Sequence, residues 1–217
     1  IILKICRKNH QKKLTLPKDL ERLKEASKNN KNLKLHFGCG PRILKNWINI
    51  DISYNPNWWD YPSENYPESI RGNKNDFFNI NFMDAPLPLP NESVDIVFSE
   101  DFIEHLNQQE TIVFLSEIYR ILKSGGLHRI NTPDLTASMK RHSNFKNGYR
   151  GVYMMEWKWG HKNILTKKYL TELAEMIGYS NIKFMTKNKS ISNIIPPEIR
   201  PGEDRAINEQ IYCDLIK

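Results

Sequence analysis

The sequence predicts an α/β fold in which a mostly parallel sheet of seven strands is covered on both faces, a three-layer sandwich. Short apolar segments alternate with segments of helical periodicity along the 217 residues, and this alternation is typical of parallel strands joined by helices. One segment, Val94–Phe98, is almost wholly apolar, as expected of a strand buried on both faces. A chain of this length supplies one substantial core, so we expect a single domain.

Seven segments have the pattern of strands. The first, Leu33–Phe37, alternates apolar and polar residues and runs into Gly38-Cys39-Gly40, which predicts a strand that ends in a tight turn. The others are Trp47–Asp51, Phe77–Ile80, Val94–Phe98, Leu127–Asn131, Ile182–Thr186 and Glu209–Ile216. A proline-rich crossing that includes Pro196, Pro197 and Pro201 separates the last two.

Three longer segments have the pattern of helices. Asp19–Ser27 is amphipathic and predicts a short helix that covers one edge of the fold as a lid or packing element. Gln108–Lys123 carries an apolar stripe and is stopped by two glycines. Thr166–Ile177 begins at a threonine cap and is followed by Gly178, so it is the clearest helix. Between the first two strands only a helix of about Ile43–Asn46 fits.

The basic residues give the chain a formal net charge of +7 and are densest between Lys4 and Lys13. A solvated basic surface accounts for most of this charge, and an anionic or nucleic-acid partner is the alternative. The charge alone does not choose between them.

The three cysteines, Cys6, Cys39 and Cys213, lie far apart and show neither metal-ligand nor redox spacing. We therefore expect a cytoplasmic protein in a reducing compartment, with no metal site. No apolar run approaches the ~18 residues of a membrane helix, and the apolar start Ile1–Cys6 is too short for a signal-peptide core. We expect no membrane association, and the sequence leaves the oligomeric state open.

Candidate ligand contacts lie where the predicted strands end, which is where open α/β sheets bind their ligands. The glycines of Gly38-Cys39-Gly40 would let a ligand approach the backbone, whose N–H groups suit a carboxylate, although a plain tight turn explains them equally well. Asp51 could accept hydrogen bonds from both hydroxyls of a ribose, or cap a helix. It follows Gly40 by only 11 residues, against about 20 in dinucleotide-binding folds, which argues against an NAD enzyme.

The segment Phe82-Met83-Asp84 follows the third strand. Its apolar pair could enclose an adenine, and the carboxylate of Asp84 could accept from the exocyclic amine. The alternative is a loop aspartate that begins the turn Pro86-Leu87-Pro88.

These motifs stand in an order that resembles a known family. The motifs are Leu35–Gly40, Trp47–Asp51, Asp84 with Leu87-Pro88-Leu89, Ser93-Val94-Asp95, Glu104-His105-Leu106 and Arg120–Gly126. Together they resemble the Rossmann-like class I methyltransferases that depend on S-adenosylmethionine, in their type 11 branch. The resemblance runs from about residue 33 to Asp134 and continues more loosely to the C-terminus.

The resemblance implies S-adenosylmethionine as cofactor, S-adenosylhomocysteine as product, and a set of cofactor contacts. Gly38, Cys39 and Gly40 would flank the methionine part, Asp51 and Ile52 the ribose, Met83 and Asp84 the adenine, and Ser99 and Glu100 the sulfonium. His36 is assigned to the same site, at a position where many relatives carry an acidic residue.

Methyl transfer is an in-line displacement in which positioning supplies most of the acceleration, so few catalytic residues are needed. An oxygen or nitrogen acceptor still loses a proton, and histidine is suited to accept it. His105 and His161 are the candidate bases, with Asp101 beside them, and a role in ordering loops is the alternative. Tyr153, Trp157 and Trp159 are candidate acceptor contacts, or aromatics that close a core edge.

We therefore expect methyl transfer to an oxygen or nitrogen of a small molecule, such as a sugar or biosynthetic intermediate. The alternatives are an RNA or DNA methyltransferase and a regulatory protein that binds the cofactor without turnover. Within the single domain 1–217 we expect a helical lid over about 1–30 and a cofactor-binding half over about 33–134. Residues 135–217 would supply the substrate loop and the final strands.

Overall fold

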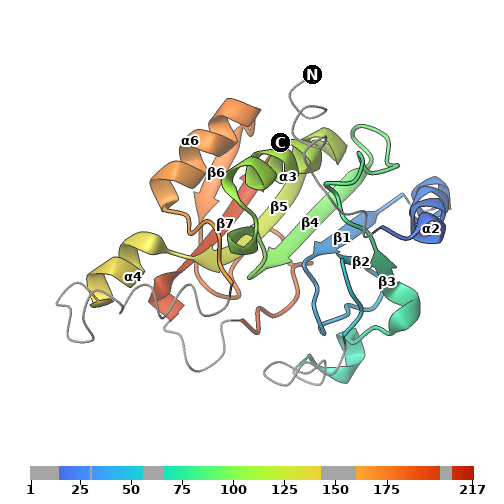
Figure 1. Ribbon diagram of the computed structural model, residues 1–217, viewed down its shortest axis with the longest axis horizontal. Coiled ribbons are helices and arrows are strands. Elements are labelled where there is room, and N and C mark those ends of the chain that lie inside the picture. The colour runs from blue at the N-terminus through green and yellow to red at the C-terminus, as the bar shows by residue number, and fades with distance from the viewer. Residues whose placement is uncertain (1–14, 30, 56–65, 143–159, 201–206) are drawn as a thin grey trace.

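The computed structural model describes residues 15–29, 31–55, 66–142, 160–200 and 207–217. Its strands form one sheet in the order β3-β2-β1-β4-β5-β7-β6 (Figure 1). They are β1 (Leu33–Phe37), β2 (Ile48–Asp51), β3 (Phe77–Asn79), β4 (Val94–Glu100), β5 (Leu122–Pro133), β6 (Asn181–Phe184) and β7 (Gln210–Ile216). The pairs from β3 to β5 are parallel, and β7 runs antiparallel to both β5 and β6. The expected seven-stranded, mostly parallel sheet is confirmed.

The helices with described bounds are α2 (Pro17–Asn29), α3 (Gln108–Ile121), α4 (Leu135–His142) and α6 (Lys167–Ile177). Asn107 and Glu110 form a reciprocal capping box at the start of α3, and Thr166 caps α6 by accepting from the backbone N–H of Tyr169. These caps satisfy N–H groups that have no partner within the helix, which fixes where each helix begins. The α4 helix was not expected from the sequence.

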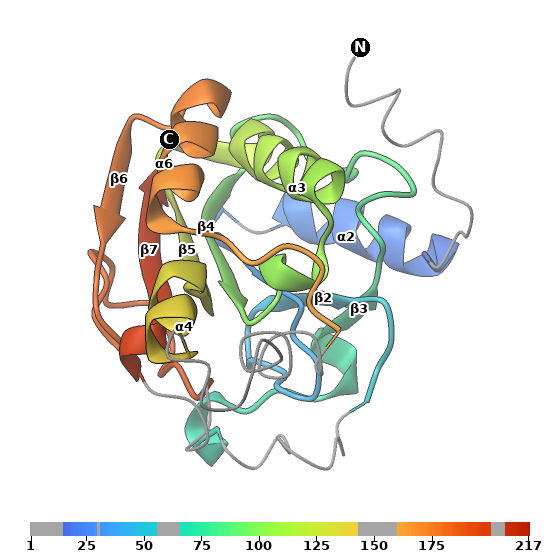
Figure 2. The same ribbon diagram turned by 60° about the vertical axis from the view of Figure 1, so that its left-hand side comes forward.

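One face of the sheet is covered by helices, with α3 and α6 packed beside each other and α2 along the edge strands (Figures 1 and 2). Alternate residues of β1 point into this layer, where the ring of Phe37 meets that of Phe114 from α3 at 5.2 Å between centroids. Leu23 of α2 is fully buried in the same cluster. This apolar layer is the main core.

The other face is covered by irregular chain. Its cluster of buried side chains contains Leu44, Trp47, Tyr66, Ile96 and Phe98, none of which belongs to an α-helix described here. The helix expected over Ile43–Asn46 is wrong, because residues 41–47 form turns and Leu44 pairs as a single antiparallel bridge with Arg71. The ten residues between β1 and β2 leave too little chain for a crossing helix.

A segment of 15 residues, 186–200, crosses this second face, and we call it the strap. It is held by a buried ion network in which Arg129 on β5 pairs with Glu198 of the strap at 2.9 Å and with Asp214 on β7 at 3.1 Å. Asp214 also accepts hydrogen bonds from Ser190 and Ile191. All three charged side chains are inaccessible to solvent. The strap is therefore bound to the centre of the sheet.

The α2 helix lies against β3, where Asp19 accepts a hydrogen bond from the Asn79 N–H and Arg22 stacks over the ring of Phe78. It is thus a packing helix, and a lid function stays a prediction. No helix in the described ranges combines the length and the apolar character that a membrane span requires.

Candidate functional site

The turn after β1 is tied to the end of β2. The Gly38 N–H donates to the carbonyl oxygen of Ile50 at 3.0 Å, and the Gly40 N–H donates to Asp51 Oδ2 at 2.8 Å. Both glycines have positive φ, +62° and +53°, a region that side chains other than glycine rarely occupy. The turn and the carboxylate, predicted separately from the sequence, form one structure at the carboxyl ends of the two strands.

Neighbouring side chains also pack directly against these two glycines. A Cβ on Gly38 would overlap the ring of Phe102, and a Cβ on Gly40 would lie 3.0 Å from Nη2 of Arg200. Packing and backbone conformation both close Gly38 to larger residues, whereas at Gly40 the positive φ is the stronger restriction.

Backbone N–H groups hold the carboxylate of Asp51. Oδ1 accepts from the Ile52 N–H at 2.6 Å, Oδ2 accepts from Gly40, and the Ser53 N–H is a third donor. Burial raises the pKa of this carboxyl, while the three N–H groups and the charge of Arg200 act in the opposite direction. A carboxylate has about four acceptor sites, so Asp51 keeps a site for a further hydrogen bond. The Ile52 side chain is half exposed beside it.

The residues predicted to contact adenine lie after β3. Met83 is buried in the main core. The carboxylate of Asp84 accepts from the Thr15 N–H at 2.9 Å and from the side-chain amide of Asn81 at 3.3 Å. Asp84 thus joins this loop to the chain that leads into α2, and its contact with adenine stays a prediction.

His36 and Ser99 lie beneath the carboxyl edge. His36 bonds to Asn49 at 3.1 Å and stacks on Phe98, and burial lowers its pKa to about 3. Ser99 is bonded to Nε2 of His128 at 3.1 Å in the main core. The ring of His128 is fully buried against Phe114 of α3. Contacts of His36 and Ser99 with a cofactor stay predictions.

Glu100, the last residue of β4, is buried among polar groups. It accepts from the Tyr66 hydroxyl at 3.3 Å, from the Asn131 amide at 3.5 Å and from the Arg200 backbone N–H at 2.8 Å. Burial raises its pKa to about 7, although the cationic side chains of Arg200 and Arg42 oppose this shift. Glu100 therefore titrates near neutral pH.

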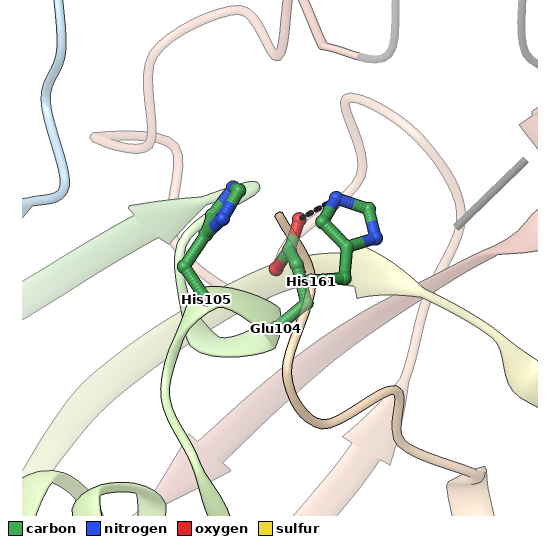
Figure 3. Close-up of side chains that lie close together, drawn as sticks. All are labelled: Glu104, His105 and His161. Atoms are coloured by element: carbon green, nitrogen blue, oxygen red, sulfur yellow. Dashed lines mark ion pairs between the residues drawn. The ribbon is translucent and has the colours of Figure 1, made fainter. Parts of the chain in front are cut away.

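The candidate catalytic residues follow β4 directly. His105 and His161 are 56 positions apart in the chain, yet their rings meet at 5.0 Å between centroids, and Nε2 of His161 lies 3.9 Å from Oε1 of Glu104 (Figure 3). Burial and the neighbouring His161 lower the pKa of His105 to about 4. Asp101, with a strained φ of +47°, precedes the group. The structure thus brings all three predicted catalytic residues to one edge.

Most residues of this site fall within a segment that matches a known protein family. Residues 35–130 match the family described as methyltransferase domain, and this range contains the glycine turn, Asp51, Glu100 and His105. This part of the chain, less than half of its length, is therefore similar to methyltransferase domains. The resemblance drawn from the sequence motifs is confirmed.

Two relatives set the extent of the likeness. A Mycolicibacterium smegmatis protein named "Probable S-adenosylmethionine-dependent methyltransferase" is 34% identical over 95 residues, which cover 44% of this chain and 32% of that protein. The chain thus matches about a third of the length of this curated relative. The crystal structure of a SAM-dependent methyltransferase from Archaeoglobus fulgidus superimposes with a TM-score of 0.55, at 18% identity over 91% of this chain and 92% of that one. This second likeness establishes the fold of the chain.

Arg200 is a residue of the site that sequence reasoning missed. Its Nη1 donates to the carbonyl oxygens of Glu100 at 2.8 Å and Asp101 at 3.3 Å, and its Nη2 donates to that of Cys39 at 3.3 Å. Arg200 is part of the strap and reaches the glycine turn although it lies 160 residues after Gly40 in the sequence. No local pattern marks it, since only tertiary structure brings a proline-flanked arginine to this edge.

The described residues fit S-adenosylmethionine at two points. Asp51 has an acceptor site left for a ribose hydroxyl, and Arg200 places a guanidinium beside the turn predicted to face the methionine carboxylate. The buried Nε of Arg200 donates to none of the described residues, and a buried donor of this kind calls for a ligand or water. The predicted acceptor contacts Tyr153, Trp157 and Trp159 lie outside the described residues.

Proposed function

We propose that this chain transfers a methyl group from S-adenosylmethionine to an oxygen or nitrogen atom of a small-molecule acceptor. The observation that carries the proposal is the bond from the Gly40 N–H to Asp51, which joins the glycine turn to an acidic strand end. This pair stands at the carboxyl ends of adjacent parallel strands, the place where such sheets bind ligands. The family match covers the same residues.

The chain's own residues would then bind and orient the reactants. Asp51 would accept from a ribose hydroxyl, and Arg200 would pair with the methionine carboxylate through charge-assisted hydrogen bonds. The cofactor supplies a methyl group on a positively charged sulfur, which is already activated. The polar group after β4, with Asp101, His105 and His161, would hold the acceptor in line with that methyl group.

The remaining assignments belong to the same proposal. Residues of about 33–134 would bind the cofactor, and 135–217 would supply acceptor contacts, including Tyr153 and Trp157. A reducing, cytoplasmic setting is supported by Cys39 and Cys213, which are buried free thiols.

A nucleic-acid acceptor is the second candidate, and the observation that favours it is the net charge of +7. A basic surface attracts phosphates regardless of sequence, so binding of this kind weakens steeply with salt. Methyl transfer to RNA or DNA that exceeds transfer to sugars and small metabolites at 150 mM salt, about the physiological ionic strength, would replace the small-molecule acceptor in this proposal.

The decisive experiment is calorimetric titration with S-adenosylmethionine and S-adenosylhomocysteine. The wild type should bind both, and Asp51→Ala should bind each at least about tenfold more weakly, a loss of about 1.4 kcal/mol. Asp95→Asn is the matched control, because Asp95 is a half-exposed carboxylate at the opposite end of β4 that pairs with Lys123. It should bind like the wild type.

Two outcomes would change the proposal. A folded wild-type protein that binds neither compound would overturn it. A protein that binds both but transfers no methyl group across a panel of alcohols, amines and nucleic acids would instead be a regulatory cofactor-binding protein.

A further inference from the structure

A group of three side chains beyond the end of β4 has the composition of a metal-binding site. Glu104 and His105 lie in the short 3-10 helix Ile103–His105, and His161 comes from a distant segment. Each offers one ligand atom, and these atoms all lie within 4.8 Å of one another. Figure 3 shows the two imidazole rings on either side of the carboxylate.

The three side chains are held by further bonds. The Thr132 hydroxyl donates to Oε2 of Glu104 at 2.9 Å, and the His105 ring donates to the backbone carbonyl of Gly160. Metal-binding carboxylates and histidines have supporting bonds of this kind, which fix the ring orientation and the tautomer. Such support distinguishes this group from a chance gathering of polar side chains.

The segment that carries His161 is fixed to the same place by its backbone. The N–H groups of Lys162 and Asn163 donate to the carbonyl oxygen of Glu104 at 2.7 and 3.1 Å. Glu104 and His161 are both buried, at 0% and 4% exposure. These backbone bonds hold the segment of His161 against the 3-10 helix that carries Glu104 and His105.

We propose that Glu104, His105 and His161 bind one divalent transition-metal ion. Nitrogen and oxygen donors in a two-histidine, one-carboxylate set suit Zn²⁺, Mn²⁺, Fe²⁺ or Co²⁺, whereas Mg²⁺ and Ca²⁺ prefer oxygen donors alone. Bonds of about 2.0–2.2 Å to a common ion require the 3.9 Å gap between His161 and Glu104 to close slightly. Three protein ligands leave coordination positions open.

The consequence for chemistry rests on the proposed function. An ion at this edge would bind a hydroxyl oxygen of the acceptor, lower the pKa of that hydroxyl and hold it in place. The hydroxyl proton leaves to water, the oxygen forms the new bond to the methyl carbon, and the electron pair of the broken carbon–sulfur bond stays on sulfur. The acceptor class is then an alcohol, and His105 and His161 act as ligands instead of general bases.

The test is metal binding by the full chain, without a histidine tag, after removal of metals with a chelator. Titration with Mn²⁺, Co²⁺ and Zn²⁺ should give one ion per chain, and bound Co²⁺ should show the visible absorption of nitrogen and oxygen ligation. His161→Ala and His105→Ala should each weaken binding by about 100-fold or more, as loss of a direct ligand exceeds loss of a supporting bond.

His128→Gln is the control, because His128 is a buried histidine outside the group, and it should bind metal as the wild type does. Glu104→Gln supplies a second variant that keeps the size of the side chain and can keep its bond to Thr132. Wild-type protein that binds none of the three ions at stoichiometric level, or histidine variants that bind like the wild type, would overturn the inference.

Titration with S-adenosylhomocysteine in the presence of chelator separates this inference from the proposed function. Cofactor binding without metal binding would refute the metal site and leave the methyltransferase proposal intact. Metal binding without cofactor binding would support the metal site and refute the methyltransferase proposal. If both hold, removal of metal should abolish transfer to alcohols and added Mn²⁺ or Zn²⁺ should restore it.

Discussion

A single buried carboxyl, that of Glu100, links the strap to the carboxyl edge of the sheet. It is 1% exposed and receives donors from Tyr66, Asn131 and the backbone of Arg200. Burial of a carboxylate disfavours its charged form, and here this effect exceeds the attraction of two nearby arginines. The protonation state of Glu100 should therefore depend on pH in the physiological range.

Glu100→Gln should change how stability depends on pH. The pKa of Glu100 is about 7 in the folded chain against an ordinary value of 4.5, so its contribution to stability is fully present below pH 4.5 and is lost as the pH rises to about 7. Each pH unit in that window removes about 1.4 kcal/mol, or about 3 kcal/mol in all. The variant cannot ionise, so relative to the wild type it should gain about 3 kcal/mol between pH 4.5 and pH 8.

Urea unfolding at a series of pH values measures this difference. The matched control is Glu172→Gln, the same substitution at an exposed carboxyl on α6. A constant difference between Glu100→Gln and the wild type would contradict the expected titration.

At the scale of the element, the strap is the part of the fold that depends most on charge. Its residue Glu198 forms two bonds of 2.9 Å to Arg129 and also accepts from the Asn188 N–H. Removing one partner of a buried pair leaves the other charge uncompensated, which costs about 3–5 kcal/mol. The strap in turn determines where Arg200 lies.

Glu198→Ala should accordingly destabilise the chain by about 3–5 kcal/mol, measured by urea unfolding at pH 7.5. Glu172→Ala, which removes the exposed pair between Lys168 and Glu172, should cost less than about 0.5 kcal/mol. Equal and small effects of the two substitutions would show that the buried network does not hold the strap.

The strands were predictable from the sequence because their apolar patterns are local, and all seven expected segments lie in the sheet. The link between β1 and β2 was not. The turns of this link are held by the buried side chain of Asn49. Its amide oxygen accepts from the Leu44 N–H, and its amide nitrogen donates to the carbonyl oxygens of Leu44, Trp47 and Asp76. A hydrophobic pattern does not show that one asparagine side chain bonds to the backbone groups of a whole turn.

Some residues of the candidate site were likewise predictable from the sequence, and others were not. Asp51, Gly38 and Gly40 could be predicted, because a carboxylate and a glycine turn at strand ends are visible in a short stretch of sequence. The neighbouring Arg200 could not, since its place depends on the path of the strap across the sheet. The grouping of His161 with Glu104 depends likewise on a contact between segments far apart in the chain.

For the whole molecule, the two faces of the sheet have different coverings, and each encloses a histidine. His36 lies on the face covered by irregular chain and His128 under α3, and burial lowers the pKa of both to about 3. The ordinary pKa of a histidine is 6.5, so each histidine binds a proton in mildly acidic solution once the chain unfolds. Stability from these groups is fully present above pH 6.5 and is lost as the pH falls toward 3.

The chain should therefore unfold readily in acid, and His36→Gln or His128→Gln should reduce this sensitivity. From pH 7.5 to pH 5.0 each variant should gain about 2 kcal/mol relative to the wild type, from about 1.4 kcal/mol per pH unit below 6.5. Urea unfolding at the two pH values measures the gain. A variant whose difference from the wild type is the same at both would show that the histidine does not remain neutral in the folded chain.

The place of β7 has a consequence for how the protein is made. This strand lies between β5 and β6 (Figure 1), and its residues Gln210–Ile216 pair with Leu127–Pro133 of β5. A ribosome therefore completes β5 long before the strand that covers its edge exists, and an uncovered edge offers its N–H and carbonyl groups to any other chain. Such a protein needs protection during synthesis, and slower translation or a scarcity of chaperones would reduce the yield of folded product before affecting any property of the finished molecule.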